Sequence, residues 1–253
     1  LGTWAEALRR FGTMSLGDVF EPAIDFAEEG VPLTRYNAQV FAGSAAKLAK
    51  FPTSAAIFLP GGKTPREGEI VKQKNLARTF RTVASQGPQV FYAGEIAEKI
   101  VKFFQQHGGF LTMADMAAYE PRYQEPIQTT FQGYTLLGLP PGSCQMTMFQ
   151  ALNIIDRPDL SKTDVWSVEF AHTWLEAMKL AFLDDDRYNT AKNDVDIPVE
   201  RLISRAYAEQ QRTRIHPGKA ARFPGLPLLP IGTTSLATAD RFGNVVAFTQ
   251  SHV

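Results

Sequence analysis

Hydrophobic residues recur every three to four positions through the first half of the chain, which is the spacing of one face of an amphipathic helix. On the segment Asn75–Ser85 this spacing places Leu76, Phe80, Val83 and Ala84 on the inward face. Hydroxyl residues and glycines at the segment ends mark where helices begin and stop. The predicted helices are Thr3–Phe11, one capped by Ser15 and stopped at Gly30, Thr34–Lys50, Asn75–Ser85, Gly94–Gln106 and one started by a Thr112–Asp115 capping box.

The period shortens to two in the second half of the chain, as is typical of strands. Two strands are predicted around a turn at Gln132-Gly133, and a Pro- and Gly-rich loop at Pro217–Pro230 is expected to be exposed. A closing hairpin begins at Thr233 and turns at Asp240–Asn244, where Gly and Asn tolerate left-handed backbone angles. The remaining predicted elements are the strands Ile127–Phe131 and Tyr134–Leu139 and the helices Gln145–Ile155, Val165–Arg187 and Val199–Thr213. The chain is therefore predicted to be mostly helical in its first half and to combine strands and helices in its second half.

Composition narrows the class of protein. Apolar residues make up 44% of the 253 residues and charged residues 21%, an ordinary globular mix. Lys plus Arg and Asp plus Glu both total 26, so no basic excess indicates a nucleic-acid partner. No apolar run approaches the length of a membrane span. The chain opens without an initiator Met and ends on an unpaired hydrophobic stretch, and we therefore expect a fragment of a longer protein.

Metal and phosphate signatures are absent, since the sequence has no HExxH, no CxxC and no P-loop. The four histidines are scattered and are expected to be structural or on the surface. The carboxylate run Asp184-Asp185-Asp186 allows either a divalent cation site or a solvated helix end balanced by Arg187 and Lys179. The histidines are His107, His172, His216 and His252.

Cys144, the single cysteine, follows a Pro-Pro-Gly-Ser loop and is expected near a helix N-terminus. A nucleophilic role requires a base, and His172 is the candidate nearest in sequence. The alternative is an incidental or structural cysteine.

Thr233 opens the closing hairpin directly after Gly232. If the bond before it is cut, this residue carries both a hydroxyl nucleophile and a free amine that can act as its base. A threonine pair such as Thr233-Thr234 is otherwise ordinary strand composition. The preceding loop is expected to be accessible to cleavage, and the Ser251 hydroxyl on the returning strand is expected to approach Thr233 or Thr234.

Several spaced motifs, in order, resemble the γ-glutamyltransferase (γ-glutamyltranspeptidase) family of N-terminal-nucleophile hydrolases, and the resemblance covers almost the whole chain. GTWAEALRRFGTMSLGDVF and GGFLTMADMAAYEPRYQEPI are similar to large-subunit segments of the family. LPPGSCQMTMFQALNIID is similar to its proline-rich loop and helix, and EAMKLAFLDDDRY to its long-helix signature. TTSLATADRFGNVVAFTQ is similar to the start of its small subunit.

The resemblance implies an α+β fold, a four-layer αββα sandwich that is incomplete in this chain and matures by cutting itself at Gly232-Thr233. It places residues 1–232 in a large-subunit-like region and 233–253 in the first hairpin of a small-subunit-like region. Thr233 is then the nucleophile and, after cleavage, the base, while Thr234 supports it and Ser251 orients it. No metal or organic cofactor is implied.

The chain departs from the family pattern at Val253, which stands where an asparagine usually binds the substrate amino group. Ser235 and the run Gly142–Gln145 also differ. The resemblance places a carboxylate-binding arginine upstream of Leu1, and an oxyanion glycine pair, a serine pair and an aspartate downstream of Val253. We therefore expect this chain alone to be inactive and to need the rest of the small subunit as its partner.

Three functions remain open at this point. The first is transfer or hydrolysis of a small γ-glutamyl amide such as a glutathione-like peptide. The second, favoured by Val253, is hydrolysis of another N-acyl or β-lactam-type amide. The third is a catalytically dead scaffold that keeps the fold. A homo-oligomer is left open, and the resemblance suggests a periplasmic or extracellular location, with the cytoplasm as the alternative.

Overall fold

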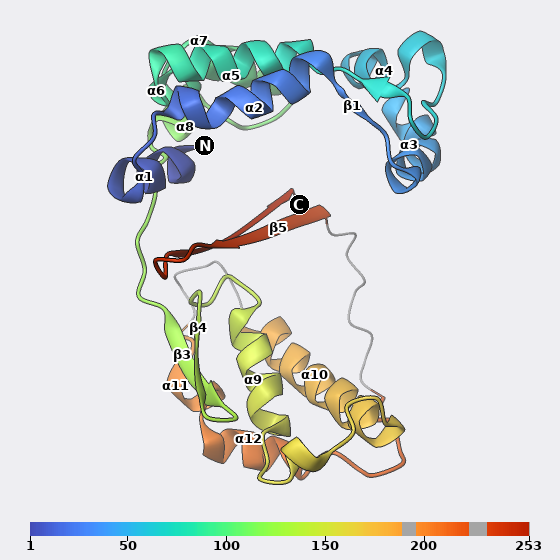
Figure 1. Ribbon diagram of the computed structural model, residues 1–253, viewed down its shortest axis with the longest axis vertical. Helices are drawn as coiled ribbons and strands as arrows, with labels where there is room; N and C mark the ends of the chain where they lie inside the picture. Colours follow the sequence, from blue (N-terminus) through green and yellow to red (C-terminus); the bar gives the residue numbers. More distant parts are fainter. Residues whose placement is uncertain (189–195, 223–231, 253) are drawn as a thin grey trace. The chain divides into compact units, whose positions relative to one another are not determined.

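The computed structural model describes residues 1–188, 196–222 and 232–252 (Figure 1). The chain divides into two compact units, Leu1–Tyr123 and Gln124–Val253, and each is described by itself. Helices and strands both occur, so the expected α+β class is confirmed. Within the described residues, no helix combines the length and apolar character needed to cross a membrane.

The first unit is mostly helical, and α2 packs along α5 (Figure 1). A short antiparallel pair joins β1 to β2. The helices of the first unit are α1 Gly2–Phe11, α2 Leu16–Glu29, α3 Arg35–Leu48, α4 Pro52–Phe58, α5 Lys74–Gln86, α6 Gln89–Tyr92, α7 Glu95–Gln106 and α8 Met113–Ala117. The unit also has a 3₁₀ turn at Pro60–Gly62 and the strands β1 Val31–Pro32 and β2 Ile70–Val71.

Local capping explains where two of these helices begin. The Ser15 hydroxyl accepts the amide of Asp18, and the Asp18 carboxylate accepts the Ser15 amide in return. Thr112 and Asp115 make the same reciprocal pair, so the predicted capping box is confirmed. Gly30 ends α2 with φ of 81°, and a Cβ there would lie 2.7 Å from the Val71 carbonyl oxygen. Only glycine fits that turn without strain.

The core of the first unit is built where α2, α5 and α6 meet. Phe20, Val83 and Val90 form its buried centre, and the rings of Phe20 and Phe80 lie 5.1 Å apart. The inward prediction for Leu76 is wrong, because its side chain is 37% exposed. Ala77, the next residue, is fully buried instead, so the buried face of α5 is turned by one position from the predicted face at this end.

The second unit combines two hairpins with a helical core. The β3–β4 hairpin turns at Gln132 and Gly133, which both have positive φ. The elements of the second unit are β3 Ile127–Phe131, β4 Tyr134–Gly138, α9 Gln145–Ile155, a 3₁₀ turn at Leu160–Lys162, α10 Val168–Tyr188, α11 Val199–Leu202, α12 Arg205–Arg212, β5 Gly232–Ala239 and β6 Val245–His252.

Helix α9 is the centre of the second unit. It packs against α10, α12 and β3, and most of its side chains are buried. Ile154 and Ile155 meet Ala177, Leu180 and Ala208 in one apolar cluster. Small residues on α10 and α12 allow these helices to approach α9 closely, so that the side chains of α9 become buried.

The single helix predicted over Val199–Thr213 is wrong, because the structure breaks it into α11 and α12. Ser204 begins α12, and its hydroxyl accepts the Tyr207 amide at 3.2 Å. The carbonyl of Ile203 accepts a hydrogen bond from Asn153 Nδ2 at 2.7 Å. An N-cap and a side chain from α9 together stabilise the break.

Candidate active site

The closing hairpin β5–β6 carries the predicted site residues. Its antiparallel register pairs Thr233 with Ser251, Thr234 with Gln250 and Gly232 with His252. Directly opposed residues of an antiparallel pair have Cα atoms about 4.5–5.5 Å apart. The register therefore makes Ser251 the cross-strand neighbour of Thr233 rather than of Thr234.

The turn of this hairpin fixes that register. The Asp240 carboxylate accepts the amides of Phe242 at 2.8 Å and Asn244 at 2.9 Å, and the Asn244 side chain at 2.8 Å. Hydrogen bonds from Asn244 hold the pKa of Asp240 below its ordinary value. Gly243 takes the left-handed angle predicted at the turn, whereas Asn244 does not take it and instead contributes through its side chain.

Thr233 and Thr234 are both exposed in the described chain. Thr233 lies at the second position of β5, so Gly232 begins the strand. Val253 lies outside the described residues, as does most of the Pro217–Pro230 loop. The structure thus brings Thr233 and Ser251 together in register and leaves the substrate-binding prediction for Val253 untested.

The prediction that Asp184–Asp186 form a solvated helix end holds only in part. Asp184 accepts hydrogen bonds from Gln150 Nε2 and from the Tyr207 hydroxyl, both at 2.8 Å, and Asp185 accepts one from Thr147 at 2.7 Å. Asp186 alone of the three is exposed. Burial, with the neighbouring Asp184 carboxylate, raises the pKa of Tyr207 to about 12. The two inner carboxylates therefore join α10 to α9 and α12.

The cation alternative gains no support, since the described residues contain no group of three or more His, Cys, Asp or Glu side chains arranged to hold a metal ion. Lys179 does not balance the carboxylate run either. Its Nζ donates to Glu176 at 2.6 Å and to the Ala221 carbonyl at 3.1 Å. Glu176 is not among the residues singled out from the sequence, although a glutamate three residues before a lysine on one helix is a recognisable signal.

Cys144 is exposed and occupies the N-cap position of α9. Its predicted partner is engaged elsewhere, because His172 Nε2 lies 3.0 Å from the carbonyl oxygen of His216. His107 likewise contacts a backbone carbonyl, that of Phe103, at 2.8 Å. These contacts fit structural histidines, and a Cys144–His172 pair is not formed.

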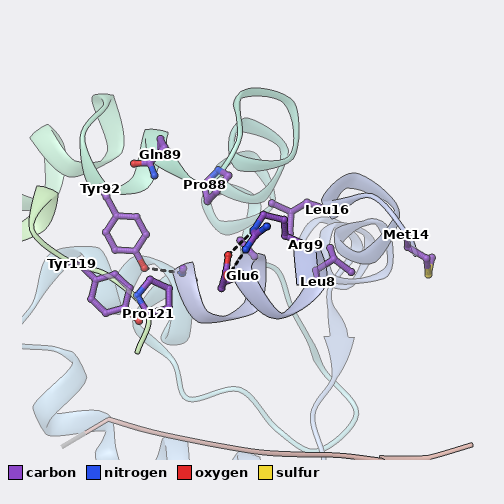
Figure 2. A pocket seen from close by; sticks show the side chains of 12 residues that line it. Glu6, Leu8, Arg9, Met14, Leu16, Pro88, Gln89, Tyr92, Tyr119 and Pro121 are labelled. Atoms are coloured by element: carbon purple, nitrogen blue, oxygen red, sulfur yellow. Dashed lines mark hydrogen bonds and ion pairs between the residues drawn. The ribbon is translucent and has the colours of Figure 1, made fainter. Parts of the chain in front are cut away.

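A cavity of about 460 Å³ lies in the first unit beside α1 (Figure 2). Tyr92 and Tyr119 stack there with ring centroids 4.9 Å apart, and the Tyr92 hydroxyl accepts the Gly2 amide at 2.8 Å. The hydrogen bonds that Arg9 and Tyr123 donate to Glu6 lower the pKa of that carboxyl to about 2. A carboxylate held ionised in this way is unsuited to general acid catalysis, and these contacts instead attach α1 to the rest of the unit.

The hairpin, the helical core and the sequence motifs place the chain in a known class. The model of the family described as gamma-glutamyltranspeptidase matches residues 1–252, so the chain belongs to that family. The acylase ACY 1 proenzyme of Pseudomonas sp. (strain SE83) is 36% identical over 251 residues, covering 98% of this chain and 45% of that protein. The glutathione hydrolase-like YwrD proenzyme of Bacillus subtilis (strain 168) is 34% identical, with 98% and 47% covered.

Among solved structures, the cephalosporin acylase from Bacillus halodurans matches with a TM-score of 0.87 and 34% identity, over 99% of this chain and 46% of that one. The predicted family and the N-terminal-nucleophile hydrolase fold are therefore confirmed. The chain spans about half the length of the curated relatives it matches.

Proposed function

We propose that the protein carrying this chain is an autoprocessing threonine amidohydrolase or acyltransferase. The observation that carries the proposal is the position of Thr233, which follows Gly232 at the start of β5 and lies opposite Ser251. Two relatives whose names mark them as proenzymes support maturation by cleavage. Residues 1–232 then form a large-subunit-like region, and residues 233–253 begin a small-subunit-like region whose remainder is the expected partner.

Self-cleavage begins when Thr233 Oγ1 attacks the carbonyl carbon of Gly232. The C–N bond breaks as the nitrogen of Thr233 gains a proton, which leaves an ester between Gly232 and the threonine hydroxyl. Water hydrolyses the ester and releases a Gly232 carboxylate and a free α-amine on Thr233. Ser251 orients the nucleophile across the hairpin, Thr234 supports it, and the absence of a Cβ at Gly232 leaves its carbonyl open to attack.

Turnover reuses the same hydroxyl. The α-amine of Thr233 takes the hydroxyl proton during attack on a substrate amide and then gives it to the leaving amine. The acyl-threonine ester passes its acyl group to water, or to the amine of an amino acid or peptide. The scheme uses no metal or organic cofactor.

The acyl donor is the finer part of the proposal. A relative named as glutathione hydrolase-like supports a γ-glutamyl amide, whereas relatives named as acylases support a different acyl group. The side chain of valine at position 253 has no atom that accepts a hydrogen bond from a substrate ammonium group, and this favours the acylase alternative. Relative rates on a γ-glutamyl anilide and on a simple acyl anilide or cephalosporin distinguish the two.

The test of the nucleophile is intact-mass analysis of the full-length protein. We expect wild type to yield a fragment that begins Thr-Thr-Ser-Leu, Thr233→Ala to remain one inactive chain, and Thr233→Ser to keep both cleavage and turnover at reduced rate. Thr238→Ala removes another exposed hydroxyl from β5 and serves as the matched control. A single uncut chain in wild type, unchanged by Thr233→Ala, would identify the dead scaffold instead.

A further inference from the structure

The segment that precedes the proposed cleavage site contacts α10 at two points, His216 and Ala221. His172, Glu176 and Lys179 are spaced by four and three residues, so they form one stripe along that helix. His172 Nε2 contacts the His216 carbonyl at 3.0 Å, and the other two residues contact Ala221. The segment from His216 to Ala221 therefore follows the helix surface.

The contact at Ala221 takes up both backbone groups of one residue. Its amide donates to Glu176 Oε2 at 3.1 Å, and its carbonyl accepts from Lys179 Nζ at 3.1 Å. Lys179 Nζ also donates to Glu176 Oε1 at 2.6 Å, which closes a ring of three hydrogen bonds. We call Glu176, Lys179 and the backbone of Ala221 the Ala221 anchor.

Burial makes this anchor more than a surface ion pair. The Glu176 side chain is 4% exposed and that of Lys179 is 35% exposed. Burial by itself would raise the pKa of Glu176, but the hydrogen bonds from Lys179 and Ala221 outweigh it and hold the pKa below its ordinary value. A charge-assisted pair with all its contacts made is strong, and removal of one partner leaves a costly unpaired charge.

We propose that Glu176 and Lys179 are positioning residues for self-cleavage, a role that rests on the proposed function at Thr233. Ten residues separate Ala221 from Gly232. Among the described residues ahead of Ala221, His216 and Arg212 are also held to the helices, with fifteen and nineteen residues between them and Gly232. Loop closure becomes less favourable with length, by a factor of about three for each doubling. The lengthened loop predicts cleavage about two- to threefold slower.

Positioning and simple stabilisation lead to different kinetics. Before the cut, Ala221 and Thr233 belong to one polypeptide, so holding Ala221 restricts the scissile bond. After the cut, no peptide bond joins them, so the anchor has no covalent route to the nucleophile. A positioning role therefore changes the rate of self-cleavage and leaves kcat per processed molecule unchanged.

The experiment uses full-length protein made by cell-free synthesis and chased at 25 °C. Intact mass gives the first-order cleavage rate, and hydrogen exchange gives the protection of the Ala221 amide. The test variant is Glu176→Gln/Lys179→Met, which removes both charges without leaving one unpaired. Lys179→Arg keeps a cationic donor, and Glu95→Gln/Lys99→Met removes an exposed pair on α7 as the matched control.

We expect the test variant to expose the Ala221 amide to faster exchange, to cleave two- to threefold more slowly and to keep the kcat of wild type once processed. Lys179→Arg should retain the protection of the Ala221 amide and the cleavage rate of wild type. The control pair Glu95→Gln/Lys99→Met should change neither quantity. Unchanged Ala221 protection, an unchanged cleavage rate, or a parallel fall in kcat overturns the positioning role while wild type still cuts itself. Absence of cleavage in wild type overturns the proposed function, and the positioning role with it.

Discussion

Among single residues, Glu6 has a protonation equilibrium that is strongly perturbed by its neighbours. Arg9 donates to its carboxylate from Nε at 2.7 Å and from the terminal nitrogen at 2.6 Å, and the Tyr123 hydroxyl donates at 2.9 Å. These bonds to the charged form lower the pKa to about 2. Sequence spacing makes the Glu6–Arg9 pair predictable on α1, but Tyr123 lies 117 residues away and has no local signal.

This equilibrium gives a pH prediction. The folded pKa lies below the unfolded value, so the stabilisation from Glu6 is present above about pH 4.5 and is lost as pH falls toward about 2. A carboxyl ¹³C NMR titration should place Glu6 near 2 in wild type. In Arg9→Gln, with its principal donor removed, we expect the midpoint to move toward the ordinary value. Arg10→Gln removes a charge that lowers the pKa of Glu6 without a hydrogen bond, so it should move the midpoint less than Arg9→Gln does. A Glu6 midpoint near 4.5 in wild type would contradict the assignment.

At the scale of elements, Asn153 explains the break that the sequence pattern does not predict. Its side chain is fully buried on α9, where it accepts from the Thr129 hydroxyl at 2.9 Å and donates to the Ile203 carbonyl at 2.7 Å. One residue thus connects β3, α9 and the junction between α11 and α12. The apolar spacing over Val199–Thr213 is continuous, so the helix boundary depends on this distant contact.

Replacement of Asn153 tests that dependence. Asn153→Leu leaves the Ile203 carbonyl without its donor, and a buried unsatisfied group costs about 1–3 kcal/mol. We expect a fall of that size in the free energy of unfolding, measured by urea titration with the fluorescence of Trp174, which packs against this core. Thr129→Val removes the other partner but leaves the Ile203 bond, so its effect should be smaller. Equal losses in both variants would argue against the junction as the sensitive point.

The features that the sequence predicts correctly are those formed by residues close together in the chain. The caps at Ser15 and Thr112 and the hairpin turn at Asp240 need only a few adjacent residues, and the structure confirms them. The predicted solvated environment of Asp184 is wrong because its hydrogen-bond donors come from α9 and α12, which are distant in sequence. Thr233 and Ser251 could be predicted as neighbours because a short turn fixes hairpin register. Their catalytic roles follow from the family resemblance and stay proposals.

For the whole molecule, the central fact is that the chain spans about half the length of its curated relatives. Large apolar side chains stand exposed in both units, among them Phe110 at 95% and Trp166 at 91%. Exposed apolar residues that stand singly are common on folded proteins and identify no partner by themselves. The proposal that the small-subunit remainder completes the site therefore rests on the resemblance and on this partial coverage.

That proposal predicts the behaviour of the 253-residue chain made alone. The resemblance places the oxyanion donors downstream of Val253, and loss of one such donor costs about 10²–10³ in rate. We therefore expect no turnover of a chromogenic γ-glutamyl or acyl anilide by the isolated chain at concentrations where the full-length protein is clearly active. Coexpression with the downstream half should restore activity if the two halves assemble, and Thr233→Ala in the same coexpression should abolish it. Clear turnover by the isolated chain would show that Thr233 finds its oxyanion stabilisation within these residues, and the two-part site would then be wrong.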